Sequence, residues 1–281
     1  MDIQEWWSSG EYVELGGHRI WMRRWGSGSP LTLLHGFPSS SHDFWKIAPA
    51  LAERYELLTL DYLGFGASDK PADHEYSIYE QTDLVEALWA REGITATTIV
   101  AHDYSVTVCE ELFARRAEGR LGVDLERVVL LNGGLYPDLH RAIAAQTALA
   151  DPEYGPQIAA NMTEELFVPG LCDTFAPDHA DADADAQDIW ESIQRGGVVV
   201  HRTIAYMAER TANAERWTGA LDSTDVPLAF AWGMLDPISG AHMAERIRER
   251  HPDAPFTALD DVSHWPPLEA PDRVAAAILS P

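Results

Sequence analysis

Short apolar runs alternate with longer segments of helical periodicity along the first half of the chain. Two runs, at residues 11–15 and 18–25, flank Gly16-Gly17, which predicts two strands joined by a tight hairpin turn. A capping box at Ser77 begins a pattern with apolar residues at helical spacing, and it predicts a helix over 77–91. A second helix is predicted over 106–116. Short buried strands are predicted at residues 31–34, 55–60, 97–101, 128–131 and 228–232.

This order of elements predicts an α/β fold. Strands of a few apolar residues that alternate with helices are typical of a mostly parallel sheet covered by helices on both faces. The opening hairpin adds antiparallel strands at one edge of that sheet.

Strand signals stop between residues 136 and 215, where the sequence is helical in character, as at 188–194 and 201–210. Because α/β folds build their sites at the carboxyl ends of parallel strands, we expect this stretch to be a helical cap over the site. The predicted core is therefore residues 1–135 and 216–281. Within the cap, the run from Asp181 to Asp185 begins like a calcium loop but lacks the later glycine and glutamate, so it predicts a solvated acidic loop.

The charge of the chain limits its partners. Lys and Arg number 20 against 45 Asp and Glu, a formal net charge of −25, which disfavours nucleic acid and anionic membranes. This acidity fits either a salt-rich cytoplasm or compositional drift. The first residues lack the basic start and apolar stretch of a signal peptide, so a cytoplasmic location is expected. Two cysteines, Cys109 and Cys172, indicate neither a disulfide framework nor a cysteine metal site.

The most informative segment is Ala101-His102-Asp103-Tyr104-Ser105, between a predicted strand and a predicted helix. A nucleophile elbow needs small residues two positions before and after the nucleophile, because the tight turn leaves no room for larger side chains. Ala101 and Ser105 meet this requirement around Asp103, and no Gly-x-Ser-x-Gly occurs in the chain. Asp103 as a simple helix N-cap is the alternative interpretation.

An aspartate at the elbow predicts a different reaction from a serine. Its carboxylate is already ionised at neutral pH, with a reference pKa of about 3.9. It can attack a saturated carbon that bears a leaving group and form an alkyl ester. Water must then hydrolyse that ester, which requires a general base and an oxyanion hole.

Five motifs occur in a familiar order. They are His35-Gly36-Phe37-Pro38, Asp61-x-x-Gly-x-Gly-x-Ser68, His102-Asp103-Tyr104, Leu235-Asp236-Pro237 and Ser263-His264-Trp265-Pro266. Over nearly its whole length the chain resembles the α/β-hydrolase superfamily, and within it the aspartate-nucleophile branch of epoxide hydrolases and haloalkane dehalogenases. Residues 132–137 and 216–221 are also similar to a subgroup that includes the vertebrate mesoderm-specific transcript protein.

The resemblance implies roles for individual residues. Asp103 would be the nucleophile, His264 the base that activates water, and Asp236 the acid that orients His264. The backbone N–H groups of Phe37 and Tyr104 would form the oxyanion hole. His35 and His102 are expected to be structural. Ser105 departs from the branch, which usually has glycine there.

The leaving group separates the two activities of the branch. Haloalkane dehalogenases hold the halide with side-chain N–H donors, and the expected positions carry Phe37 and Tyr104, which have none. Trp190 in the cap could supply one such donor near the substrate. Epoxide hydrolases instead use cap tyrosines to protonate the ring oxygen. The candidates are Tyr206, with Tyr154 as the second donor and Tyr136 competing at the cap entrance.

We therefore predict an epoxide hydrolase acting on a small apolar organic substrate. A haloalkane dehalogenase and a non-catalytic relative of the same fold are the alternatives. An esterase or lactonase is disfavoured because it would carry Ser or Cys at the elbow. The chain has no complete nucleotide-binding glycine motif, P-loop or zinc-protease motif, so no cofactor and no metal are expected.

Overall fold

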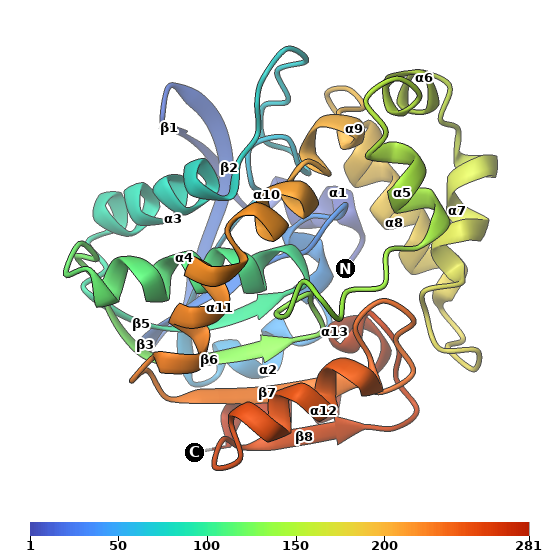
Figure 1. Ribbon diagram of the computed structural model, residues 1–281. Helices are drawn as coiled ribbons and strands as arrows, with labels where there is room; N and C mark the ends of the chain where they lie inside the picture. Colours follow the sequence, from blue (N-terminus) through green and yellow to red (C-terminus); the bar gives the residue numbers. More distant parts are fainter. Residues whose placement is uncertain (281) are drawn as a thin grey trace.

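The computed structural model describes residues 1–280 and centres on one eight-stranded sheet with the order β1-β2-β4-β3-β5-β6-β7-β8 (Figure 1). The pairs β1–β2 and β2–β4 are antiparallel, and every other neighbouring pair is parallel. The strand bounds are β1 Glu11–Leu15, β2 His18–Gly26, β3 Ser29–Leu34, β4 Tyr55–Leu60, β5 Ala96–His102, β6 Asp124–Leu131, β7 Leu228–Gly233 and β8 Phe256–Leu259. The mostly parallel α/β sheet that the sequence predicted is thus confirmed, and β8 is an additional strand.

The edge hairpin forms at the predicted turn. Gly16 and Gly17 both have positive φ, at 58° and 83°, which is the backbone that a two-residue hairpin turn requires. Leu15 of β1 therefore pairs directly with His18 of β2.

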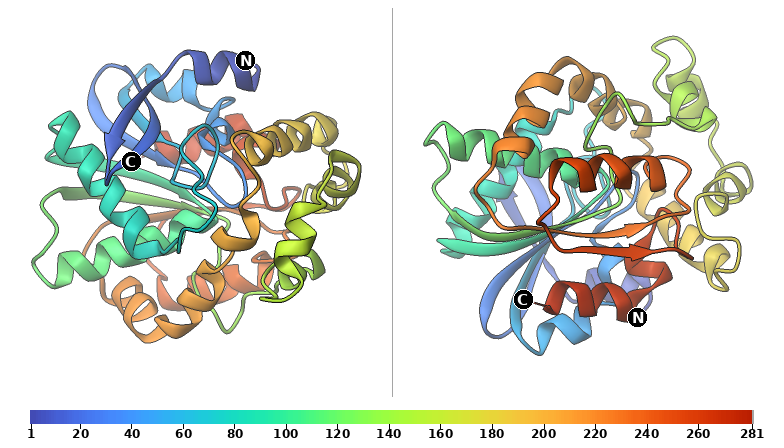
Figure 2. Two further views of the ribbon diagram at one scale, coloured as in Figure 1. Left: turned by 90° about the horizontal axis from the view of Figure 1, so that it is seen from above. Right: turned by 60° about the horizontal axis from the view of Figure 1, so that its bottom comes forward.

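Helices cover both faces of the sheet (Figure 2). One face is covered by α1, α2 and α14. Trp6 and Trp7 of α1 pack in the same core as Phe44 and the buried side chains of α2 and α14. The other is covered by α3, α4, α11 and α12. The helix bounds are α1 Ile3–Ser8, α2 Ala48–Ala52, α3 Ile78–Glu92, α4 Tyr104–Ala117, α11 Ala214–Ser223, α12 Ala241–Arg250 and α14 Pro271–Leu279, with short turns η1 Ser41–Phe44 and α13 Pro266–Glu269. Within residues 1–280, every helix is too short or too polar to cross a membrane.

Between β6 and β7 the described chain is helical. It contains α5 Ala144–Leu149, α6 Gly155–Ala160, α7 Glu164–Cys172, α8 Ala182–Gln194, α9 Val200–Thr203 and α10 Tyr206–Ala212, followed by α11. The helices α5 to α7 form a lobe that projects beyond the sheet (Figure 1). The helical segment expected at 201–210 is broken between α9 and α10, at Ile204 and Ala205.

The acidic run at 181–185 is not a loop, as the sequence analysis expected. Asp181 precedes α8, and Asp183 and Asp185 lie in its first turn, where the helix dipole favours negative charge. Asp185 is buried and accepts hydrogen bonds from Lys46 Nζ at 2.8 Å and His179 Nε2 at 2.7 Å. The expectation failed because Lys46 comes from a distant part of the chain, and only the fold brings it to Asp185.

The carboxylate of Asp61, at the end of β4, ties three segments together. It is fully buried and accepts hydrogen bonds from Trp7 Nε1 of α1, from the backbone and hydroxyl of Ser41, and from the backbone of Ala67. These four bonds measure 2.6–3.0 Å. Asp61 therefore fixes the N-terminal helix and the loops at the carboxyl edge of the sheet.

Substituting Asp61→Asn should lower the free energy of unfolding by roughly 3 kcal/mol, because an amide N–H₂ would then face donors in a buried site. Urea denaturation monitored by tryptophan fluorescence measures the change. Asp253→Asn, at an exposed position, serves as the control and should be neutral. Equal stability of the two variants would contradict this role of Asp61.

Candidate active site

Asp103 lies at a sharp turn between β5 and α4, the expected position of an elbow. It is the one non-glycine residue of the described chain with positive φ, at φ 48° and ψ −104°. Such a backbone costs roughly 1–3 kcal/mol and persists only when its surroundings enforce it. Gly36 and Gly133 leave the space for it, because a Cβ on Gly36 would lie 2.9 Å from Asp103 Cβ, and one on Gly133 would lie 2.8 Å from the Asp103 carbonyl oxygen.

Ser105, which replaces the usual glycine, has its hydroxyl fully engaged. Its Oγ donates to the carbonyl of His35 and lies 2.9 Å from the hydroxyl of Tyr62. The side chain is completely buried. Ser105 therefore braces the loop after β3 against α4, and this contact excludes it as a nucleophile.

Asp103 faces the loop after β3 on one side and His264 on the other. Its Oδ2 accepts a hydrogen bond from the backbone N–H of Phe37 at 2.9 Å. Its Oδ1 lies 3.8 Å from Nε2 of His264. The N–H of Tyr104, the first residue of α4, lies where helix N–H groups lack partners within the helix. The two predicted oxyanion-hole residues thus flank the carboxylate.

His264 is held by a carboxylate that is itself held on several sides. Its Nδ1 lies 2.9 Å from Oδ2 of Asp236. Asp236 also accepts from Asn132 Nδ2, Ser239 Oγ and the backbone N–H of Ile238, at 2.7–2.9 Å. This arrangement fixes the imidazole with Nε2 toward Asp103.

The charges of this group shift the pKa values of both partners. Burial alone would lower the pKa of His264, but attraction and hydrogen bonding to Asp236, followed by attraction to Asp103, raise it to about 9. Burial opposes ionisation of Asp236, yet His264, Ser239 and Asn132 bring its pKa below the ordinary value. At neutral pH the pair is therefore an imidazolium and a carboxylate.

The loop that carries His264 is tied down by residues that the sequence analysis did not identify. The carboxylate of Glu269 accepts from the backbone N–H groups of Ser263 and Trp265, at 3.0 and 2.8 Å. The carbonyl of Thr174, beyond α7, accepts from the N–H of His264 at 3.1 Å. Thr174 Oγ1 also accepts from the indole N–H of Trp265 at 2.8 Å. The helical segment thus contacts the site directly.

Asn132 is the other residue that was missed as a site residue. Its carbonyl accepts from the N–H of Asp103 at 2.8 Å, while its side-chain amide holds both Gly233 and Asp236. It thereby links the three strands β5, β6 and β7. Its place in Asn132-Gly133-Gly134 was the available signal, but only the strand order gives it a role.

His35 and His102 make backbone contacts, as expected of structural residues. The Nδ1 of His35 donates to the carbonyl of Gly36 and its Nε2 accepts from the N–H of Tyr62. The Nε2 of His102 lies 2.8 Å from the carbonyl oxygen of His264. Both rings are fully buried.

Tyr206, at the start of α10, lies against the elbow. Its ring centroid is 4.9 Å from that of Tyr104 and 5.7 Å from that of Phe37. Its hydroxyl is buried and has no hydrogen-bond partner among residues 1–280. Burial and the charge of Asp103 raise the pKa of Tyr206 well above its ordinary value, so the phenol stays protonated. The guanidinium of Arg210 lies 5.2 Å over the same ring.

The structure does not bring the other predicted cap residues to this position. Tyr154 lies beside α6 with 55% of its surface exposed, so it cannot act as the second acid. The hydroxyl of Tyr136 donates to Asp222 of α11 at 2.9 Å and is committed there. Trp190 packs against Phe167 in the interior of the helical segment and does not line the cavity described next.

A cavity of about 360 Å³ lies between the helical segment and the core. Its inner end is formed by Phe37, His264 and Trp265, and its outer walls come from α5, α6 and α7. The lining is almost entirely apolar, and Leu166 at the outer end is 72% exposed. The cavity suits an apolar molecule that reaches His264.

Fold and site together define a class of protein. Residues 29–271 match the family profile described as alpha/beta hydrolase fold, and the chain belongs to this family. Among curated proteins, LipZ of Mycobacterium tuberculosis is 36% identical over 281 residues, which cover 99% of this chain and 97% of that protein. The human mesoderm-specific transcript homolog protein is also 36% identical, over 96% of this chain and 84% of that protein. The resemblance to the mesoderm-specific transcript subgroup is confirmed.

More distant proteins carry names from both activities of the branch. Haloalkane dehalogenase 2 of Mycobacterium bovis is 26% identical over 90% of this chain and 88% of its own. The solved structure of the epoxide hydrolase CorEH superposes with a TM-score of 0.73 at 19% identity, covering 96% of each chain. At that identity the structural match shows the fold alone.

Titration of His264 followed by nuclear magnetic resonance should give a midpoint near pH 9, because the two carboxylates stabilise the imidazolium. The midpoint should fall in Asp236→Asn, where the main attraction is lost. Since the folded-state pKa lies above the model-peptide value of 6.5, the stabilisation is complete below pH 6.5 and is lost as the pH rises through 9. A wild-type midpoint at or below 6.5 would contradict the assignment.

Proposed function

We propose that this protein is an epoxide hydrolase that works through an ester between its substrate and Asp103. The observation that carries the proposal is the setting of the Asp103 carboxylate. One oxygen accepts from the Phe37 N–H at 2.9 Å, and the other faces His264 at 3.8 Å. In this arrangement Oδ1 is free to attack the substrate. The Phe37 N–H can stabilise the negative charge that develops on Oδ2 when the ester is hydrolysed.

The first step opens the ring. Oδ1 of Asp103 attacks one epoxide carbon, the carbon–oxygen bond breaks, and the oxygen takes the proton of the Tyr206 hydroxyl. Tyr206 suits this role because its phenol is buried beside the elbow, has no other partner and remains protonated. A positioned general acid typically contributes roughly 10²–10⁴-fold to the rate.

The second step hydrolyses the ester. Water gives a proton to His264 Nε2 and attacks the carbonyl carbon of the Asp103 ester, with the oxyanion on the N–H groups of Phe37 and Tyr104. The intermediate then collapses and the diol leaves with the proton from His264. The carboxyl group of Asp103 that results returns its proton to His264, which restores the charges of the resting protein.

Esterification itself prepares His264 for this step. In the resting protein the charge of Asp103 helps to raise the pKa of His264 to about 9, so the ring is protonated and cannot act as a base. Formation of the ester removes that negative charge and therefore lowers the pKa of His264. The ring then releases its proton, and the Tyr206 phenolate left by ring opening takes up a proton in exchange. The base thus becomes available after the nucleophile has reacted.

The cavity supports an apolar substrate. Its walls from α5, α6 and α7 offer almost no polar groups, and His264 is one of the few at its inner end. We therefore propose an epoxide on an apolar carbon framework.

Haloalkane dehalogenation is the second candidate, and one observation favours it. Arg210 is only 2% exposed, its guanidinium lies beside Tyr206, and its Nη1 has no hydrogen-bond partner within residues 1–280. A guanidinium in that position could hold a departing halide in place of the tryptophan N–H groups. Trp190 packs against Phe167 within the helical segment, which weakens the arrangement first considered for this activity.

His264→Gln should trap the ester, because attack by a carboxylate needs no base whereas hydrolysis does. Incubation with a terminal epoxide such as 1,2-epoxyhexane should add the mass of the substrate to the intact protein, and digestion should locate it on Asp103. The double variant with Asp103→Asn should gain no mass. Rapid steady turnover by His264→Gln would exclude His264 as the base.

Tyr206→Phe should slow ring opening by roughly 10²-fold or more, because the ring is kept and only the acid is removed. Single-turnover measurement of ester formation separates this step from hydrolysis. Tyr154→Phe is the matched control, since that phenol is exposed and should be dispensable. An unchanged rate in Tyr206→Phe would contradict its role, and halide release from 1-halohexanes without epoxide turnover would favour the second candidate.

A further inference from the structure

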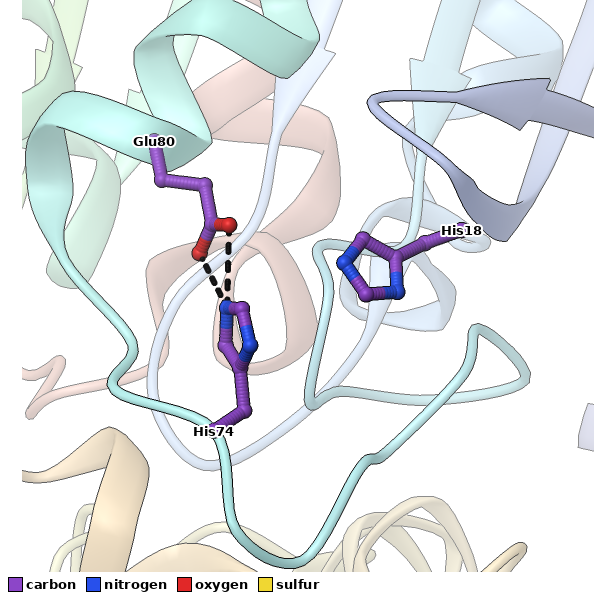
Figure 3. Close-up of side chains that lie close together, drawn as sticks. All are labelled: His18, His74 and Glu80. Atoms are coloured by element: carbon purple, nitrogen blue, oxygen red, sulfur yellow. Dashed lines mark hydrogen bonds and ion pairs between the residues drawn. The ribbon is translucent and has the colours of Figure 1, made fainter.

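A second group of polar side chains lies away from Asp103, between the edge hairpin and α3. It consists of His18, His74 and Glu80, which we call the hairpin cluster (Figure 3). His18 begins β2 after the hairpin turn, His74 lies in the loop before α3, and Glu80 lies in the first turn of α3. The hairpin turn and the stretch from His74 to Glu80, which are distant in sequence, thus direct potential metal ligands toward a common point.

We propose that the hairpin cluster binds a divalent transition-metal ion, and that zinc fits this site. Two imidazoles and one carboxylate are a ligand set that zinc accepts, with water in the fourth position. Magnesium and calcium prefer sites made of oxygen ligands, so two imidazoles select against them. The proposal is independent of the reaction at Asp103.

The distances are compatible with coordination after a small adjustment. The potential ligand atoms all lie within 4.8 Å of one another, and Nε2 of His74 is 2.9 and 2.7 Å from the two oxygens of Glu80. Zinc bonds of about 2.0–2.2 Å in a tetrahedron bring ligand atoms to about 3.4 Å apart. The ring of His18 therefore needs to move closer by about 1 Å, and His74 and Glu80 need to separate slightly. The proton on His74 Nε2 leaves to solvent when the metal binds.

The side chains are free to make this adjustment. The ring of His18 is half-buried and makes no hydrogen bond to any residue of the described chain, and its centroid lies 5.3 Å from that of His74 at an interplanar angle of 77°. The side chains of His74 and Glu80 are 25% and 31% exposed, so a hydrated ion can reach them. Within residues 1–280, His74 and Glu80 form an ion pair only with each other.

A bound ion would link the edge hairpin to the loop before α3 and to α3 itself. The hairpin turn already lies against α3, since a Cβ on Gly16 would be 3.0 Å from the Leu84 side chain. Coordination would add a link from this turn to the loop around His74, whose ring packs 4.9 Å from that of Tyr76. Because metal bound only by the folded state stabilises it, zinc should raise the unfolding temperature.

Isothermal titration of the untagged, chelator-treated full-length protein with zinc chloride tests the proposal. Wild type should bind one zinc ion per chain. This binding should be lost in each of the variants His18→Ala, His74→Ala and Glu80→Gln, and magnesium chloride should give no signal. Circular dichroism of each variant checks its fold. His242→Ala, which changes a half-buried histidine of α12, is the matched control and should bind like wild type.

Thermal unfolding provides a readout that distinguishes this ion from zinc bound elsewhere. Zinc should raise the unfolding temperature of wild type and of His242→Ala, but not that of the three cluster variants. Absence of zinc binding to wild type, or equal stoichiometry and equal thermal shift in His18→Ala, would overturn the proposal.

Discussion

The backbone of Asp103 is the constraint on which the site depends. A positive φ at an aspartate is unfavourable, and it persists only because its surroundings enforce it. Gly36 and Gly133 leave out the side chains that would collide with this turn, and the Asn132 carbonyl accepts the N–H of Asp103. The strain is thus supported by the neighbouring strands β3 and β6. Its consequence is a carboxylate raised out of the sheet edge toward both Phe37 and His264.

A second dependence is electrostatic. Three buried ionisable groups, Asp103, His264 and Asp236, lie in contact within a protein of strongly negative net charge. Each of these charges would be costly to bury alone. When they are buried together, the positive charge of the imidazolium offsets negative charge of the two carboxylates. Any reaction that neutralises Asp103 must therefore change the proton affinity of His264. This coupling gives the proposed two-step reaction its order without requiring movement of the protein.

The segment between β6 and β7 supplies what the sheet cannot. Its helices α5 to α7 form the apolar walls of the cavity, Thr174 holds the His264 loop, and α10 places one phenol beside the elbow. Only one of the three tyrosines considered from the sequence reaches that position. The site therefore offers a single phenol together with the uncommitted guanidinium of Arg210, which is why both leaving groups are considered.

The sequence by itself determined the fold class, the family and the position of the elbow between a strand and a helix. These features follow from local information, because apolar periodicity, paired glycines and short motifs each involve residues that are close together in the chain. It could not place Tyr154, Tyr136 or Trp190, because the orientation of a cap helix depends on what it packs against. Nor could it identify Asn132, Glu269 or the hairpin cluster. The partners of Asn132 and of His18 lie on other strands and loops, and only the tertiary structure brings them together.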